Sequence, residues 1–128
     1  MMKGFLRLAV AGALVMSLAG AVPAMAKDGD VIRRGSCSGA SDWKLKLSPE
    51  DGRIEVEYEV DSNVVGQTWK VKIFKNGTRI LGGSRVTKAP SGSFTVRLVT
   101  SNPAGTDAFR GKAVNANTGE SCIGRASF

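Results

Sequence analysis

The chain has 128 residues with 18 basic and 11 acidic side chains, two cysteines and no histidine, and its formal net charge is +7. The absence of histidine excludes Ser-His-Asp and Cys-His nucleophile systems, histidine-ligated zinc and the usual base for catalysis near neutral pH. A chain of this length is expected to form one domain with a modest hydrophobic core.

The first 26 residues have the three parts of a secretory signal peptide. A basic start at 1–7 precedes an apolar run at 8–22, and Ala24-Met25-Ala26 supplies the small residues that stand before a cleavage site. We therefore expect cleavage after Ala26 and a secreted, extracellular domain of residues 27–128. The apolar run is short and contains glycine, so we expect no membrane span after cleavage, and an uncleaved anchor is the alternative.

Charge is unevenly distributed along the mature chain, which keeps 16 basic and 11 acidic residues. Residues 27–61 carry six basic and nine acidic side chains, whereas residues 62–128 carry ten basic and only two acidic ones. A basic surface attracts anionic partners such as cell-wall polymers, lipid headgroups or nucleic acid, although the same charge also serves solubility.

Cys37 and Cys122 are the two cysteines of the chain. In an exported protein such a pair predicts one disulfide, here closing a loop of 85 residues between the first and last strands, with two buried thiols as the alternative. The chain-entropy model assigns about 4.5 kcal/mol of stability to a loop of that length.

Alternation of apolar and polar residues predicts strands from the start of the mature chain onward. A short strand is expected at 31–36, then Trp43–Leu47 with lysines on its wet face, then Ile54–Asp61 with acidic residues on its wet face. A turn at 48–52 is expected between the strands Trp43–Leu47 and Ile54–Asp61, because this segment contains proline and glycine at positions that turns favour.

The charges of the side chains, together with the buried and solvent-facing sides of each strand, also predict how these strands pair. Placing Leu47 opposite Ile54 sets lysines opposite glutamates on the wet face and Trp43 opposite Tyr58 on the buried face. The lysines of a strand at 69–73 are expected to face the same glutamates from the other side, which would make a Lys–Glu–Lys ladder. A slip of one residue would bury the glutamates, so the register is strongly specified.

Turn residues divide the rest of the chain into further strands. Asn76-Gly77 favours a type I′ hairpin, because both residues accept a positive φ, and Gly82-Gly83 indicates a bulge or bend in the return strand. Strands are predicted at 78–86, 93–99, 107–115 and 120–127, separated by loops at 88–92, 100–105 and 117–119.

About seven short strands with a period of two predict one antiparallel β-sandwich of immunoglobulin-like architecture, with a small barrel as the alternative. Trp43, Tyr58 and Trp69 are expected in its core. The signature of antibody domains is absent, because Trp43 follows Cys37 by only six residues and Cys122 is nearly terminal.

No residue pattern indicates catalysis, a cofactor or a metal. The chain has no Walker loop, no dinucleotide-binding glycine motif and no Cys-x-x-Cys pair. Glu55, Glu57 and Glu59 stand about 6.6–7 Å apart on one strand face, a spacing that suits an acid–base pair, but a charge ladder explains them better. Asp28-Gly29-Asp30 resembles the start of a calcium loop and lacks its later ligands.

Four segments run through most of the mature chain: Cys37 with Asp42-Trp43-Lys44-Leu45-Lys46, Gly52-Arg53-Ile54-Glu55-Val56-Glu57, Gln67-Thr68-Trp69 and Ser91-Gly92-Ser93-Phe94. Together they resemble small secreted proteins of high-GC Gram-positive (actinobacterial) bacteria. The resemblance implies a β-rich fold with one disulfide. It implies no catalytic or binding residue, because that group has no assigned function.

These observations predict a secreted, non-enzymatic binding domain without a cofactor, whose extracellular partner is an anionic polymer or a protein and not a specific nucleic acid. One alternative is an inhibitor of an extracellular hydrolase acting through the 100–105 loop, and another is a hydrolase using Glu57 with a neighbouring carboxylate. The candidate residues for contact with an anionic partner are Arg85, Lys88, Arg97, Arg110 and Lys112.

Overall fold

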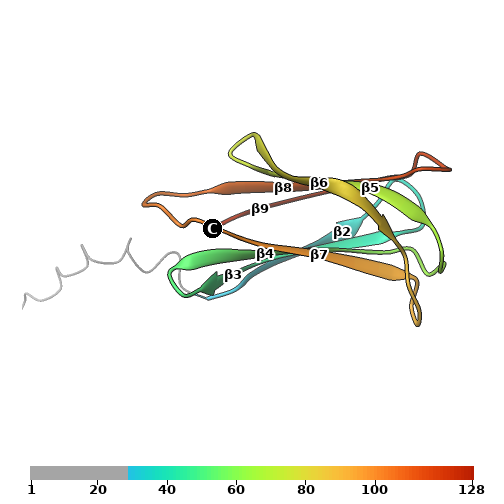
Figure 1. Ribbon diagram of the computed structural model, residues 1–128, viewed down its shortest axis with the longest axis horizontal. Coiled ribbons are helices and arrows are strands. Elements are labelled where there is room, and N and C mark those ends of the chain that lie inside the picture. The colour runs from blue at the N-terminus through green and yellow to red at the C-terminus, as the bar shows by residue number, and fades with distance from the viewer. Residues whose placement is uncertain (1–28) are drawn as a thin grey trace, which may run out of the picture.

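Two antiparallel sheets pack face to face as a β-sandwich (Figure 1). The computed structural model describes residues 29–128, so the predicted signal peptide at 1–26 and its cleavage site lie outside the described residues. Each sheet has four strands, and within 29–128 no strand pairing joins one sheet to the other. The predicted sandwich is therefore confirmed, with eight strands instead of about seven, and the barrel alternative is wrong.

The first sheet has the strand order β2-β3-β4-β7, and the second has the order β6-β5-β8-β9. Every predicted strand is present, with bounds that differ from the predicted ones by at most three residues. The strands are β2 (Val31–Ser36), β3 (Asp42–Glu50), β4 (Arg53–Asp61), β5 (Thr68–Lys75), β6 (Thr78–Val86), β7 (Ser93–Thr100), β8 (Ala108–Asn115) and β9 (Ser121–Ser127).

The β3–β4 hairpin turns at Asp51 and Gly52, whose φ angles are 49° and 77°. Two positive φ angles in a two-residue turn are typical of a type I′ hairpin, so both strands continue up to the turn. The register consequently differs by two residues from the predicted one, and Leu47 pairs with Val56 instead of Ile54. Because the side-chain period of a strand is two, every residue stays on its predicted face.

The second neighbour of β4 also differs from the prediction. β4 pairs with β7, and Arg97 stands opposite Glu57. β5 belongs to the other sheet, so its lysines do not face the glutamates of β4. Alternation assigns the two faces of a strand, but it carries no information about which strand lies beside it.

The hairpin between β5 and β6 agrees with the prediction, since Asn76 and Gly77 have φ angles of 50° and 85°. The bulge in β6 lies elsewhere. Ile73 pairs with Leu81 and Phe74 pairs with Arg79, which leaves the intervening Ile80 as the extra residue. The predicted site of the bulge, Gly82-Gly83, keeps a regular ladder with β5.

The core lies between the inner faces of the sheets. Tyr58 and Trp69 are fully buried, and Trp43 is half-buried against the same cluster. The Tyr58 hydroxyl donates a hydrogen bond of 2.9 Å to the carbonyl oxygen of Cys122, and burial raises the pKa of Tyr58 above its ordinary value. Glycine makes room for an aromatic ring in β9, where a Cβ on Gly124 would meet the Trp43 indole.

One long side of the sandwich is closed by the predicted disulfide, which joins Cys37, directly after β2, to Cys122 in β9. Beside it, a Glu120 carboxylate oxygen accepts hydrogen bonds from the backbone N–H groups of Gly39 (3.1 Å) and Ser41 (2.8 Å). The other carboxylate oxygen accepts a bond of 3.0 Å from the Ser41 hydroxyl. Both connections hold β9 and the β8–β9 turn against the first sheet.

Candidate functional site

The two sheets carry very different charge. The strands of the first sheet contain six basic and six acidic residues, so their charges balance. The strands of the second sheet contain no acidic residue. They contain eight basic residues, namely Lys70, Lys72, Lys75, Arg79, Arg85, Arg110, Lys112 and Arg125.

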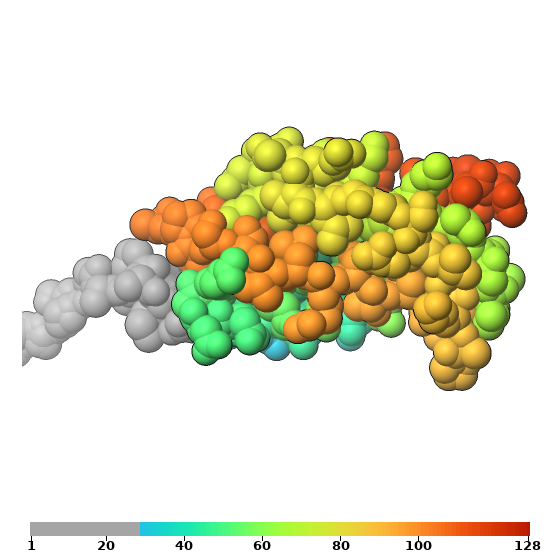
Figure 2. Space-filling view, viewed as in Figure 1, coloured from blue at the N-terminus to red at the C-terminus, as the bar shows by residue number. Residues whose placement is uncertain are grey.

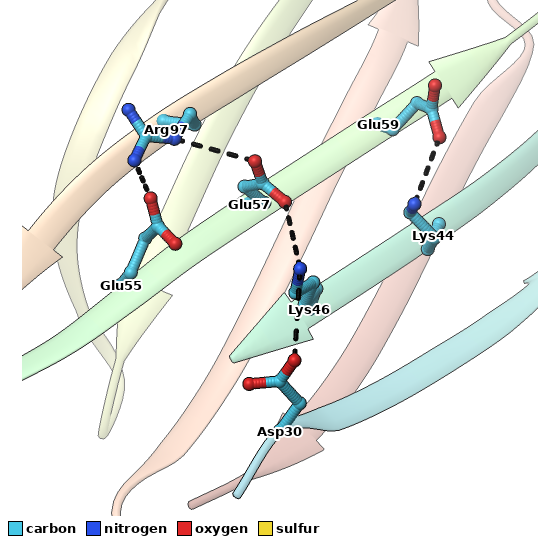
Figure 3. Close-up of polar contacts among 7 residues, drawn as sticks. All are labelled: Asp30, Lys44, Lys46, Glu55, Glu57, Glu59 and Arg97. Carbon is cyan, nitrogen blue, oxygen red and sulfur yellow. Dashed lines mark ion pairs between the residues drawn. The ribbon is translucent and has the colours of Figure 1, made fainter. Parts of the chain in front are cut away.

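The outer face of the first sheet carries an ion-pair ladder across β3, β4 and β7 (Figure 3). Its pairs are Lys44–Glu59 at 3.8 Å, Lys46–Asp30 at 3.8 Å, Lys46–Glu57 at 4.0 Å, Arg97–Glu57 at 3.4 Å and Arg97–Glu55. The ladder is therefore Lys–Glu–Arg instead of the predicted Lys–Glu–Lys. Glu57 lies between two cations, and the charges of this face largely neutralise one another.

The outer face of the second sheet is basic. In β5, Lys70 and Lys72 are exposed while Trp69, Val71 and Ile73 between and beside them are buried, so the two lysines point away from the core. The pairing of β5 with β6 and β8, and of β8 with β9, places the outward-pointing residues of those strands beside the two lysines. We define the basic face as Lys70, Lys72, Arg79, Arg110, Lys112 and Arg125.

None of the ion pairs found within residues 29–128 includes a side chain of the basic face. The register even sets like charges directly opposite each other, Lys72 against Lys112 and Arg110 against Arg125. Cross-strand neighbours have Cβ atoms about 4.5–5.5 Å apart, and like charges at that separation destabilise a sheet. An anion lying between such a pair replaces the repulsion by attraction.

Two shallow hollows lie on the basic face. One has a volume of about 150 Å³ and is lined by Lys70, Lys72, Lys112 and Val114. The other has a volume of about 280 Å³ and lies at the end of the sheet near the Asn76-Gly77 turn, where Arg110 and Arg125 line it. The Arg110 guanidinium carbon is 4.2 Å from the centroid of the Phe74 ring.

The structure brings together only two of the five predicted contact residues. Arg110 and Lys112 lie on the basic face. Arg97 lies on the other sheet, within the ion-pair ladder. Arg85 and Lys88 line a groove of about 520 Å³. The strands β6 and β7, which border this groove, lie on the side of the molecule that Figure 2 shows. The predicted set is thus divided among three surfaces.

Sequence reasoning missed four residues of the basic face. The alternation in β5 indicated that Lys70 and Lys72 point outward, but the predicted pairing placed them opposite glutamates. Arg79 stands near the start of β6, which also contains Arg85, and Arg125 is the only cation of β9; neither stood out in a pattern. The outward direction of Lys70 and Lys72 could be read from local alternation, but their common face with Arg110 and Lys112 depends on the order β5-β8-β9.

The loop after β7, proposed above for an inhibitor, is fastened at its base. The Lys75 ammonium donates hydrogen bonds to the Thr100 hydroxyl (3.2 Å), the Ser101 carbonyl oxygen (2.6 Å) and the Ser101 hydroxyl (3.0 Å). These hydrogen bonds hold the start of the loop in place, a role that a disulfide would otherwise serve. The inhibitor role itself stays a prediction.

Other kinds of site find little support in the part of the chain that the structure describes. No group of three or more His, Cys, Asp or Glu side chains there is placed to hold a metal ion. No helix in residues 29–128 is long and apolar enough to cross a membrane. A hollow of about 500 Å³ over β2, β3 and β4 is lined by side chains of both signs, including Arg34, Lys44, Asp42 and Glu59.

The basic face is the most one-sided concentration of charge among residues 29–128, because the strands that carry it contain no acidic residue. No family model matches this sequence, and no curated protein is significantly similar to it.

Proposed function

We propose that the protein is a secreted, non-enzymatic binding domain whose basic face holds an anionic polymer of the cell surface or the extracellular space. The observation that carries the proposal is the six cations on one outer sheet face, none of them in an ion pair within residues 29–128 and with no acidic residue in the strands beneath. Such a face attracts anions at long range and repels other basic surfaces.

A polymer suits the distribution of these charges better than a single small ion. Lys70 and Lys72 stand about 6.6–7 Å apart along β5, and neighbouring strands lie about 4.8 Å apart. A small ion can contact only one or two of these side chains. An extended chain with repeating charges contacts several at once and releases the counterions that each contact displaces.

We further infer that the sandwich is immunoglobulin-like. When β2 is set aside, β3-β4-β7 faces β6-β5-β8-β9, which corresponds to strands A-B-E facing C-F-G with one added strand beside C. The disulfide differs from that of antibody domains, because Cys37 lies in a loop and not in an inner strand.

Salt dependence provides the first test. If all six cations contact a single-chain polyanion, the logarithm of the binding constant falls with the logarithm of salt concentration with a slope of about −4. Affinity would then fall by a factor on the order of 300 between 50 and 200 mM salt. The probe is fluorescent dextran sulfate, titrated with the oxidised domain of residues 27–128.

The variant Lys70→Gln, Lys72→Gln, Lys112→Gln removes three charges from exposed or half-exposed positions of this face. We expect its salt slope to become shallower by about 2 and its affinity at 0.1 M salt to fall on the order of 100-fold.

The matched control is Arg85→Gln, Lys88→Gln, Arg97→Gln, which removes the same net charge from the other surfaces. We expect it to bind nearly as the wild type does. Equal weakening by both triple variants would show that net charge, and not the basic face, drives binding. Absence of binding at 50 mM salt would refute the proposal outright.

A further inference from the structure

We propose that Arg110 and Arg125 form a subsite of the basic face that binds a phosphomonoester group. The inference rests on the proposed function, since it concerns the same face, and it names the chemical group that this end of the face selects. Three features of the hollow carry it: the pairing of the two arginines, the contact of one of them with an aromatic ring, and the absence of acidic residues from the strands beneath them.

The two arginines meet because they are direct partners in the β8–β9 ladder. Both line the hollow of about 280 Å³. Small residues border it: Gly77 lies in the β5–β6 turn, and Ala108 pairs with Ser127 at the end of the ladder. These small side chains leave space beside the guanidinium groups, and the Ser127 hydroxyl adds a neutral hydrogen-bonding group.

Arg110 is held in place before any ligand arrives. Its guanidinium carbon lies 4.2 Å from the centroid of the Phe74 ring, within the range of a cation–π contact. This contact holds the guanidinium against the aromatic ring, and its N–H groups can still donate to an anion. A donor that is already oriented loses less conformational entropy on binding, and a guanidinium fork matches two oxygens of one anion.

Charge and oxygen count select the ligand. Two guanidinium groups carry two positive charges, and the four strands beneath them contain no acidic residue. A carboxylate or a phosphodiester carries one negative charge and two free oxygens, enough for one bidentate contact. A phosphomonoester carries about 1.5 to 2 negative charges at pH 7 and three free oxygens, enough to bridge both arginines.

Three small probes separate these ligands: methyl phosphate, dimethyl phosphate and acetate. Each is titrated into the oxidised domain at constant ionic strength, with backbone amide chemical shifts as the readout. We expect methyl phosphate to bind most tightly and to shift the amide signals of β8 and β9 around the two arginines. Comparable affinity for acetate or dimethyl phosphate would overturn the proposal.

A change of pH supplies a second readout. Methyl phosphate loses its second proton with a pKa of about 6, so its dianion fraction falls about fourfold between pH 7.5 and pH 5.5. The chain contains no histidine, so a matching fourfold loss of affinity reports the ionisation of the ligand. An affinity that is equal at both pH values would overturn the proposal.

Variants locate the subsite. Arg110→Gln and Arg125→Gln are each expected to weaken methyl phosphate binding about tenfold and to abolish its pH dependence. The matched control Arg85→Gln removes the same charge from β6 of the same sheet, outside the basic face, so it should keep both properties. Unchanged binding by Arg125→Gln, with a native amide spectrum, would place the ligand elsewhere.

The dextran sulfate titration separates the two proposals. If the wild type binds the polymer through the basic face but shows no preference for methyl phosphate, the subsite is wrong and the proposed function stands. If the wild type binds neither the polymer nor methyl phosphate, both are wrong.

Discussion

Replacing Gly124 by alanine tests the packing that holds β9, and with it Arg125, against the first sheet. An ideal Cβ at this position would lie 2.5 Å from Cε3 and 2.6 Å from Cζ3 of Trp43. Non-bonded carbon atoms are most stable about 3.5–4.0 Å apart, so the overlap is about 1 Å. The indole has little room to retreat, because a Cβ on Gly35 would lie 2.7 Å from Cζ2 of the same ring.

We expect Gly124→Ala to lower the free energy of unfolding by about 1–3 kcal/mol, the usual cost of overpacking a core. Alanine also restricts the unfolded chain, which offsets this cost by about 0.4–1 kcal/mol. In a domain of this size each kcal/mol lowers the melting temperature by about 4–8 °C. Urea and thermal unfolding, followed by circular dichroism under oxidising conditions, measure both quantities.

Gly82→Ala in β6 is the matched control. A Cβ there would meet only the flexible end of the Arg79 side chain, at 3.4 Å or more, so we expect a change within about 0.5 kcal/mol. In a double-mutant cycle, Trp43→Phe should relieve part of the cost of Gly124→Ala, since the smaller ring leaves more space. Equal stability of the two alanine variants would refute the packing argument.

Three further predictions concern single residues. Glu120→Gln should lower the free energy of unfolding by about 1–3 kcal/mol in urea, because a charged acceptor of two backbone N–H groups is lost. Arg97→Gln should cost no more than about 1 kcal/mol, because the Arg97 side chain is exposed to solvent, and it should leave dextran sulfate binding unchanged, because Arg97 lies outside the basic face. Tyr58 is the only tyrosine, and burial raises its pKa in the folded state. Its contribution to stability is therefore complete below pH 10 and is lost above it, by up to about 1.4 kcal/mol per pH unit. Urea unfolding between pH 9 and pH 11 should show this additional loss in the wild type and not in Tyr58→Phe.

The faces of individual strands were predictable because side-chain alternation is a local property of extended backbone. Along Ile54–Asp61 it assigned Tyr58 to the core and the glutamates to solvent, and the structure agrees. The Asn76-Gly77 turn was predictable for the same reason, since positive φ is a property of single residues. The β3–β4 register was two residues off, because the chain turns at Asp51-Gly52 alone and not over the whole segment 48–52.

The candidate site was harder to predict from the sequence. Sequence reasoning placed Lys70 and Lys72 against glutamates and singled out neither Arg79 nor Arg125, so it missed four of the six residues of the basic face. Local alternation directs Lys70, Lys72 and Arg125 outward, but the four residues share a face only because β6, β5, β8 and β9 are neighbours in one sheet. Arg97 and Arg110 both lie in strands with alternating side chains. Arg97 has two glutamate partners because its strand belongs to the first sheet, whereas Arg110 stands opposite Arg125 because its strand belongs to the second sheet.

The sequence by itself determined the β class, the faces of the strands, the Asn76-Gly77 hairpin and the disulfide, because each depends on neighbouring residues or on the chain having only two cysteines. Only the tertiary structure decided that β4 lies beside β7 and β5 beside β8. Those neighbours are far apart in sequence, and their pairing depends on how the inner faces of both sheets fill one common core. The same packing places Lys44, Lys46 and Arg97 in the ion-pair ladder of one sheet and six other cations on the basic face of the second sheet, where no ion pair is found within residues 29–128.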